Sequence, residues 1–237
     1  MGTGALLPIY YYNDVFMMKP DVQGVYFNNF GTKFFDKASK EGTTTLKLQL
    51  ASEPDKLDPA LNSSVDGAIL AAASFGGLYT YNEAGELAPN FATGYEMSED
   101  GLSYVFTMRE GLKWSNGDPI TAKDFEYSWK RAVAAETAAD YSYMFDSIKG
   151  YPDALDVSAS EDGTTFTVNL KAPVAYFLDL AAFPTFFAVH QPTVENAAGF
   201  KDEAGAVVNP GAWALEAGFV SSGAFTLAEW KHEESMV

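Results

Sequence analysis

Cysteine is absent from this 237-residue sequence, and histidine occurs only twice, as His190 and His232. Without cysteine there is no thiolate nucleophile, disulfide, zinc ribbon or iron–sulfur cluster. Two isolated histidines also give little basis for a metal site or for imidazole catalysis, because both need partner groups nearby. Glycine-rich phosphate loops, zinc-protease motifs and serine-hydrolase elbows are missing as well. The sequence therefore predicts no metal, no cofactor and no enzyme activity.

Basic residues are scarce, since 15 Lys and Arg stand against 32 Asp and Glu, for a formal net charge of −17. This balance argues against nucleic acid and anionic membranes as partners, because phosphate neutralisation needs cations. Long apolar runs are also missing. The longest, residues 174–189, contains Asp179 and Pro184 and is too short to cross a bilayer. No basic leader with a small-residue cleavage site opens the chain, so we expect a soluble chain without a signal peptide.

Hydrophobic residues make up 47% of the chain and aromatic residues 15%. This composition can bury a core, and its aromatic content suits a binding surface. Apolar alternation predicts strands, helical periodicity predicts helices, and residues 121–124 resemble a capping box. The expected strands are 6–12, 24–35, 46–50, 102–108, 166–170, 185–189 and 225–230; the expected helices are 66–74, 121–133, 174–182, 192–198 and 211–217. Because the two kinds interleave without strict βαβ alternation, we expect a mixed α/β fold.

Several long stretches occur in the order found in one protein family. They are LKLQLASEPDKLDPALN, FGGLYTY, the block from LAPNFATGYEM to WSNGDPITAKDFEYSWKR, AYFLDLAAFPTFFAV and SSGAFTLAEWK. Together, residues 46–232 resemble the N-terminal lobe of the oligopeptide-binding proteins, the extracytoplasmic substrate-binding components of ABC peptide importers (solute-binding family 5). The resemblance implies a mixed-sheet lobe of the type II periplasmic-binding-protein-like fold.

Residues 6–37 resemble the extreme C-terminal segment of the same family, although here they stand at the front. We therefore expect a circularly permuted lobe in which residues 38–45 form a linker. Residues 46–237 would be the N-terminal lobe, making one structural domain with 6–37, and the second lobe would be missing. Residues 6–35 should pair with the strand at 46–50 or with its neighbours, because an unpaired aromatic strand would expose an apolar edge.

The resemblance implies non-catalytic capture of extended peptides between two closing lobes, for delivery to an ABC permease. The parent protein would be periplasmic or a membrane-anchored lipoprotein. Alternatives are another solute (oligosaccharide, nickel or heme) or an engineered folding scaffold without ligand. An isolated lobe should bind peptide weakly and self-associate through its exposed cleft face. The expected ligand-binding residues are Ser63, Val65, Tyr141, Tyr143, Ser222, Gly223, Ala224 and Phe225.

Overall fold

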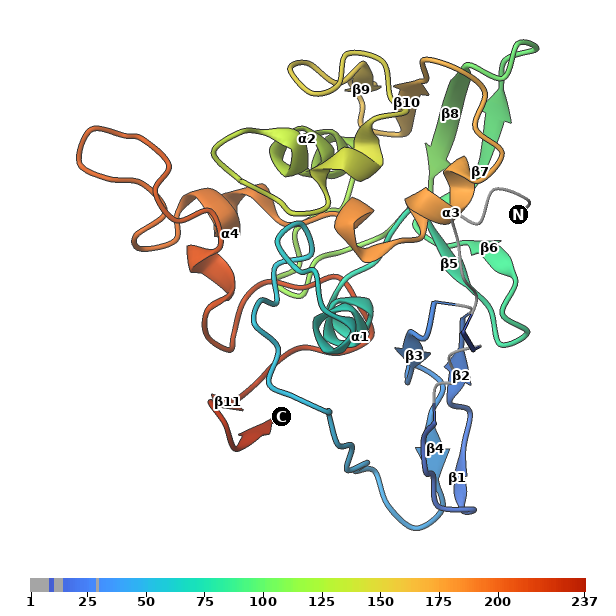
Figure 1. Cartoon of the computed structure of the whole chain (residues 1–237), viewed down its shortest axis with the longest axis vertical. Helices are drawn as coiled ribbons and strands as arrows, with labels where there is room; N and C mark the ends of the chain where they lie inside the picture. Colours follow the sequence, from blue (N-terminus) through green and yellow to red (C-terminus); the bar gives the residue numbers. More distant parts are fainter. Residues whose placement is uncertain (1–8, 11–14, 29) are drawn as a thin grey trace.

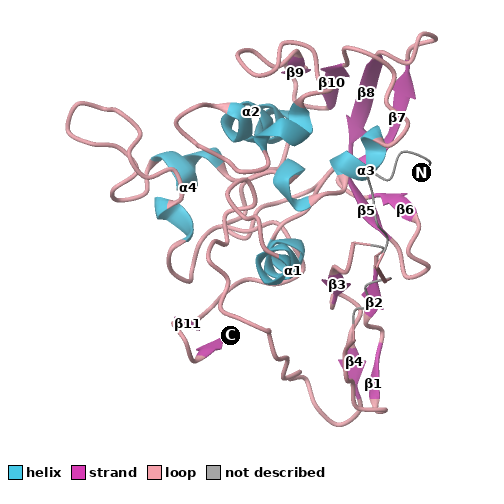
Figure 2. Ribbon diagram, viewed as in Figure 1, coloured by secondary structure: helices cyan, strands magenta, loops and turns pink. Residues whose placement is uncertain are grey.

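The computed structural model describes residues 9–10, 15–28 and 30–237, and its helices and strands interleave along the chain (Figures 1 and 2). The helices are α1 (Val65–Ser74), α2 (Ala122–Val133), α3 (Phe177–Ala181) and α4 (Gln191–Glu195), with 3-10 turns η1 (Ser142–Phe145), η2 (Pro184–Phe186) and η3 (Ala212–Ala214). The strands are β1 (Val22–Gln23), β2 (Tyr26–Phe27), β3 (Lys33–Phe34), β4 (Ser39–Lys40), β5 (Tyr79–Tyr81), β6 (Leu87–Pro89), β7 (Ala92–Met97), β8 (Ser103–Met108), β9 (Val157–Ala159), β10 (Thr165–Asn169), β11 (Trp230–Lys231) and β12 (Ser235–Met236). No helix in the described ranges is both long and apolar enough to span a bilayer.

The largest sheet is antiparallel, with the strand order β7-β8-β10-β9. The alternation that predicted two of its strands is confirmed, because Phe106 of β8 and Phe166 of β10 pair in register and are fully buried. Each of these strands follows the same Ser-Glu-Asp-Gly turn. In both copies the serine hydroxyl donates to the aspartate at 2.6 Å, and the glycine has a positive φ that favours glycine.

Helix α2 packs on this sheet and begins at the expected capping box. The Thr121 amide donates to the Asp124 carboxylate at 2.7 Å, and the Thr121 hydroxyl caps the first turn in return. Phe125 and Trp129 on its apolar stripe are fully buried. The Trp129 indole also donates to the Phe186 carbonyl at 2.8 Å. This bond ties η2 to the centre of the core.

A buried ion pair joins α2 to the segment that precedes α1. The Arg131 guanidinium donates to both carboxylate oxygens of Asp58, and the two side chains are only 6% and 2% exposed. Asp58 also accepts from the Trp213 indole at 2.8 Å and from the Ala60 amide at 3.0 Å. The Arg131 guanidinium reaches the Pro210 carbonyl at 2.8 Å. Three parts of the chain that are distant in sequence are therefore fixed at one point.

The expected pairing of residues 6–35 with 46–50 is wrong for the residues that the structure describes. Strand β1 pairs with β4 and β2 with β3, so residues 22–40 form their own antiparallel hairpin. Residues 46–50 have no regular secondary structure and join no sheet among the described residues. The short spacing between β2 and β3 makes local pairing the easier closure. Most of the expected strand 6–12 lies outside the described residues.

Two further expected strands are absent from the described fold. The buried run 185–189 forms η2 and irregular backbone, because its polar groups bond elsewhere: the Val189 amide donates to the Ser128 hydroxyl at 2.9 Å. Within 225–230, only Trp230 enters a strand, because the Phe225 amide donates to the Ala73 carbonyl of α1 at 3.1 Å. The helices expected near 174–182, 192–198 and 211–217 are present but shorter.

Candidate functional site

The loop before α1 carries two of the expected binding residues, Ser63 and Val65. Buried Asn62 shapes this loop by accepting from the Ser64 amide at 3.2 Å, and Ser64 then caps α1 through the Gly67 amide at 3.2 Å. A side chain at Gly67 would place its Cβ 1.9 Å from the Asn62 amide oxygen, so glycine is required here. The result is a fixed turn with Ser63 exposed and Val65 59% exposed at the helix start.

The segment from Asp140 to Tyr143 lies against this loop. The Ser63 hydroxyl donates to the Asp140 carboxylate at 3.0 Å, and the Tyr141 hydroxyl reaches the Ser63 carbonyl at 3.4 Å. Fully buried Phe145, which stacks on a core ring at 4.0 Å between centroids, anchors the following turn η1. The structure thus brings together two expected segments that are nearly 80 positions apart in the chain.

A row of aromatic side chains extends from this point; we call it the aromatic row. Its members are Tyr143, Tyr141, Phe183, Phe30 and Tyr81, and successive ring centroids lie 6.0 to 6.5 Å apart. Tyr143 is 59% exposed and Phe30 is 58% exposed. Burial, then the hydrogen bond to Asp179, raises the pKa of Tyr81 well above its usual value. Sequence reasoning missed Phe183, Phe30 and Tyr81, because no spacing rule links residues from separate elements.

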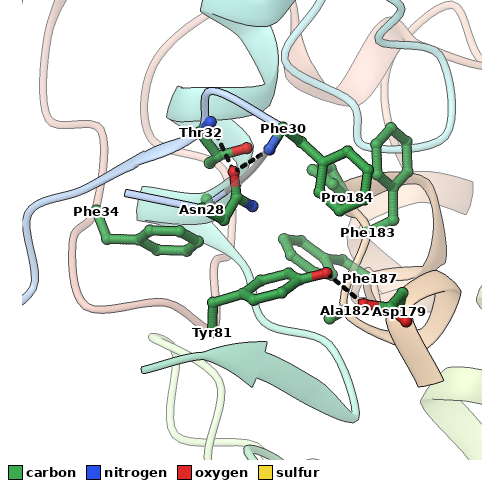
Figure 3. A pocket seen from close by; sticks show the side chains of 11 residues that line it. Asn28, Phe30, Thr32, Phe34, Tyr81, Asp179, Ala182, Phe183, Pro184 and Phe187 are labelled. Atoms are coloured by element: carbon green, nitrogen blue, oxygen red, sulfur yellow. Dashed lines mark hydrogen bonds between the residues drawn. The ribbon is translucent and has the colours of Figure 1, made fainter. Parts of the chain in front are cut away.

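The hollow beneath the row is too small to hold a ligand side chain. Its volume is about 10 Å³, which is room for about one water molecule. Figure 3 shows its polar edge, where the Asn28 side chain accepts from the Phe30 and Thr32 amides at 3.0 and 2.9 Å. Opposite it, the Tyr81 hydroxyl donates to Asp179 at 2.8 Å. The first contacts fix the turn of the N-terminal hairpin and the second fixes Tyr81 in the body, while the ring contacts of Phe30 with Tyr81 and Phe183 join the two parts.

The remaining expected residues, Ser222 to Phe225, lie at the other end of α1. The amides of Ser222 and Gly223 donate to the Ser74 carbonyl at 2.9 and 2.8 Å, so they cap the helix C-terminus. A ten-residue helix is about 15 Å long, which separates this turn from the Ser63 loop. No hydrogen bond or ring contact joins the two groups within the described ranges. Ala224 and Phe225 are exposed.

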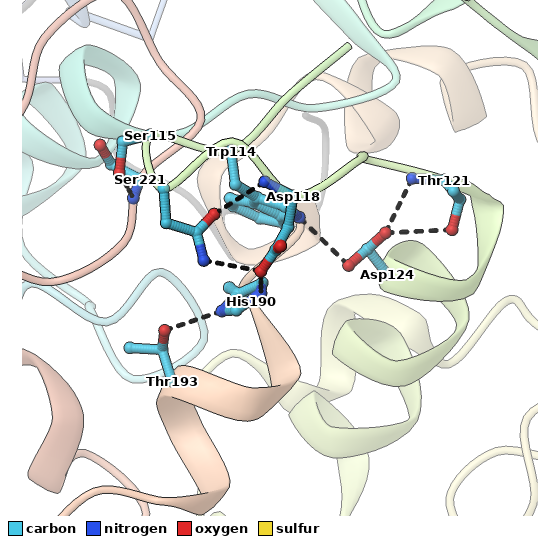
Figure 4. Close-up of polar contacts among 9 residues, drawn as sticks. Trp114, Ser115, Asp118, Thr121, Asp124, His190, Thr193 and Ser221 are labelled. Carbon is cyan, nitrogen blue, oxygen red and sulfur yellow. Dashed lines mark hydrogen bonds and ion pairs between the residues drawn. The ribbon is translucent and has the colours of Figure 1, made fainter. Parts of the chain in front are cut away.

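A second polar cluster lies around His190 (Figure 4). The imidazole is buried, with Nε2 3.0 Å from Asp118 and Nδ1 2.8 Å from the Thr193 hydroxyl. Nearby, the Ser115 amide donates to the Ser221 carbonyl at 2.8 Å and the Ser221 amide donates to the Ser115 hydroxyl at 3.1 Å. Within the described residues neither serine hydroxyl contacts the ring. Both ring nitrogens are thus occupied, and the contact with Asp118 ties the loop before α2 to the start of α4.

A groove with a volume of about 460 Å³ lies between α2 and α4 and contains none of the expected residues. Its walls carry charges of both signs, and at least one pair neutralises itself, because Lys130 and Glu126 lie 2.5 Å apart. Among the described residues, no group of three or more His, Asp or Glu side chains is placed to hold a metal ion. The Ser63–Asp140 contact and the aromatic row therefore form the candidate site.

Comparison with known proteins places this geometry in a family. The chain is 35% identical to the oligopeptide-binding protein OppA of Bacillus subtilis, over 89% of this chain and 38% of that protein. It is 30% identical to the probable deoxycholate-binding periplasmic protein YgiS of Escherichia coli, over 78% of this chain and 34% of the relative. The solved structure of Listeria monocytogenes OppA bound to peptide matches with a TM-score of 0.70 and 32% identity, over 80% of this chain and 37% of that one.

The chain thus spans little more than a third of the length of these relatives. The likeness to the peptide-bound structure confirms the expected periplasmic-binding-protein-like α/β fold. The family model described as bacterial extracellular solute-binding proteins, family 5 Middle, matches residues 86–237. This match covers well over half of the chain, and the chain belongs to that family of solute-binding proteins.

Proposed function

We propose that this chain is a peptide-contacting lobe of an ABC-importer solute-binding protein, which captures extended peptides without chemistry. Two similar proteins support peptide as the solute, one named oligopeptide-binding and one solved with peptide bound. The observation that carries the proposal is the contact of Ser63 with Asp140 and Tyr141 on an exposed surface beside the aromatic row. Delivery to a membrane permease, and a periplasmic or lipoprotein location, follow from the same assignment.

The candidate site offers the groups that an extended peptide needs. The Asp140 carboxylate is exposed and can accept from a peptide amide or ammonium group. Val65 and Tyr143, in the two segments that the Ser63–Asp140 contact joins, present exposed apolar surface. Backbone bonds with roomy apolar contacts give affinity with little sequence preference. At the far turn, the amides of Ser222 and Gly223 already cap α1, which leaves Ala224 and Phe225 to meet the ligand.

We also propose that residues 6–37 are the counterpart of the family's C-terminal segment, joined through residues 38–45 to a lobe formed by 46–237. The start of this linker differs from the expectation, because Ser39 and Lys40 form β4 and pair with β1. The packing of the described hairpin on that lobe supports this order. Phe30 contacts the rings of Tyr81 and Phe183, and the Lys37 ammonium lies 2.6 Å from the Glu83 carboxylate. A lobe on its own would make only part of the ligand contacts, so weak binding and self-association through the aromatic row are expected.

Calorimetry with a mixed peptide library tests the function, using the chain as it stands and a chain extended by a relative's second lobe. We expect millimolar affinity for the first and micromolar affinity for the second. Micromolar binding corresponds to a binding free energy of about 8 kcal/mol, and a lobe that makes half of the contacts would keep about 4 kcal/mol of it. Deoxycholate and oligosaccharides are titrated as alternative ligands, and deoxycholate is included because one relative is named for it. Binding of either in preference to peptide would overturn the assignment of solute.

A matched pair of tyrosines tests the site within the extended protein. Tyr143 is 59% exposed in the aromatic row, whereas Tyr176 is 60% exposed and makes no ring contact with the row in the described structure. We expect Tyr143→Ala to weaken peptide binding roughly two- to tenfold, and Tyr176→Ala to leave it unchanged. Equal effects of the two substitutions would refute the placement of the site.

A further inference from the structure

The turn before α2 contains Asn116, the one asparagine of the sequence that is followed by glycine. An asparagine side chain can react with the backbone amide of the next residue, and a glycine presents that amide with no Cβ to hinder the approach. Asn116 and Gly117 are both exposed, and Gly117 has a positive φ of 94°. The turn therefore carries the residue pair best suited to this intramolecular reaction.

The reaction is a deamidation, and water is its only co-reactant. The Gly117 amide nitrogen gives its proton to hydroxide and attacks the side-chain carbonyl carbon of Asn116. A bond forms between these two atoms, the bond to the side-chain nitrogen breaks, and ammonia leaves after taking a proton from water. A second water then opens the succinimide ring at either carbonyl, which produces aspartate or isoaspartate at position 116. No atom is oxidised or reduced, so no redox partner is needed.

Two hydrogen bonds to Asp118 hold the Asn116 side chain, and we call them the Asp118 clamp. The side-chain Nδ2 donates to the Asp118 carboxylate at 2.7 Å, and Oδ1 accepts from the Asp118 amide at 3.1 Å. The Gly117 amide in turn donates to the Trp114 carbonyl at 2.9 Å. Deamidation breaks bonds at both ends, because Gly117 loses the proton that it donates and Nδ2 departs as ammonia. The folded turn therefore slows the reaction.

The Asp118 clamp belongs to the polar cluster around His190 (Figure 4). The same Asp118 oxygen that accepts from Asn116 lies 3.0 Å from His190 Nε2, at the start of α4. Deamidation replaces the donor of the clamp by a carboxylate, so that two like charges face each other where a hydrogen bond stood. Repulsion of Asp118 from this position would weaken the tie between the turn and α4.

We propose that Asn116 is a site of spontaneous deamidation, that the Asp118 clamp limits the rate in the folded protein, and that the modification loosens the tie between this turn and α4. The site is separate from the aromatic row, and the reaction does not depend on ligand binding. The contacts that control it come from the turn itself and from the neighbouring α4.

Incubation of the chain at mildly alkaline pH, followed by peptide mapping with mass spectrometry, measures deamidation at each asparagine. We expect Asn116 to react faster than every other asparagine of the folded chain. Asp118→Ala removes the charged acceptor and should raise the rate at Asn116 about three- to thirtyfold. Asp118→Asn keeps an uncharged acceptor, so its rise should be smaller, about two- to tenfold.

Thr193→Val is the matched control, because it removes the other contact of His190 and leaves the Asp118 clamp in place. Its rate at Asn116 should equal that of the unsubstituted chain. Circular dichroism checks that each variant is folded; if Asp118→Ala is not, the comparison of Asp118→Asn with Thr193→Val decides. The proposed effect on the tie is tested by urea unfolding, where Asn116→Asp should have a lower midpoint than Asn116→Ala, since only the former adds a like charge.

Three results would overturn the proposal. The first is a deamidation rate at Asn116 no higher than at the other asparagines. The second is an equal rate in the Asp118 variants and in Thr193→Val, which would mean that general loosening of the cluster, and not the clamp, sets the rate. The third is a urea midpoint of Asn116→Asp at or above that of Asn116→Ala.

Discussion

Replacing Asp58 by alanine should be among the most destabilising single changes in this protein. The carboxylate accepts from the guanidinium of Arg131, from the indole of Trp213 and from the amide of Ala60. Its removal leaves a buried guanidinium whose side chain is only 6% exposed, and among the described residues the Pro210 carbonyl is then its one remaining acceptor. An uncompensated buried charge cannot regain its lost hydration, so the folded state carries the full desolvation cost.

The expected loss is about 3–5 kcal/mol in the free energy of unfolding, the range found when one partner of a buried pair is removed. Since domains are stable by about 5–15 kcal/mol, this is a large share of the total. For a chain of this length, each kcal/mol lowers the melting temperature by about 2–4 °C, so Asp58→Ala should melt about 6–20 °C lower. Removing Arg131 as well takes away the orphaned charge and should recover part of the loss.

Urea denaturation of the two single alanine variants and the double variant measures these quantities. The control is Glu83→Ala, which breaks the exposed pair with Lys37, whose side chains are 53% and 61% exposed. That change should cost less than about 1 kcal/mol. The argument from buried charge would be refuted if Asp58→Ala cost no more than Glu83→Ala in the free energy of unfolding. It would also be refuted if the effects of the alanine changes at Asp58 and Arg131 were strictly additive.

Three further changes have defined outcomes. Gly223→Ala would set a Cβ 2.4 Å from a backbone oxygen of α1, so its urea midpoint should fall by the equivalent of about 1–3 kcal/mol, whereas Gly94→Ala has open space and should change little. Thr121→Ala removes the cap of α2 and should cost about 0.5–2 kcal/mol in the same assay. The hydrogen bond to Glu53 raises the pKa of His232 above 6.5, and a backbone amide lowers the pKa of Glu53 below 4.5. The stability that protonated His232 contributes is fully present below pH 6.5 and is lost as pH rises through its raised pKa. The stability that ionised Glu53 contributes is fully present above pH 4.5 and is lost as pH falls through its lowered pKa. Their contact should thus be tightest between these values, and NMR titration of His232 should show the raised pKa drop in Glu53→Gln.

The parts of the fold predicted correctly are those with strong local signals. The turn before β8 and the capping box of α2 are each determined by a few consecutive residues, because the side chains that form their hydrogen bonds are neighbours in sequence. The helix at 66–74 was also foreseen, from its run of small apolar residues and the glycines that end it. None of these needed knowledge of distant parts of the chain.

The failures share a different cause, which is competition from distant partners. Residues 185–189 have the apolar content of a buried strand, but the Phe186 carbonyl and the Val189 amide bond to side chains of α2. Residues 46–50 alternate as a strand should, yet alternation states only which face is apolar and not whether a partner strand exists. Within the site, the ring contact between Phe30 and Phe183 could not be predicted, because it depends on how the hairpin of residues 22–40 packs against the rest of the protein.

The position of the candidate site derives from buried residues that precede it in the chain. The Asp58 carbonyl accepts from the amides of Leu61 and Asn62, at 3.1 and 2.9 Å, so the turn that leads to Ser63 starts at the buried ion pair. Asn62 is itself buried and fits only because residue 67 is glycine. Ser63 is exposed, and its hydroxyl is held in the described structure only by exposed Asp140. The loop therefore owes its shape to the core beneath it. A loop shaped in this way can present its backbone to a ligand without first being ordered, which lowers the entropic cost of binding.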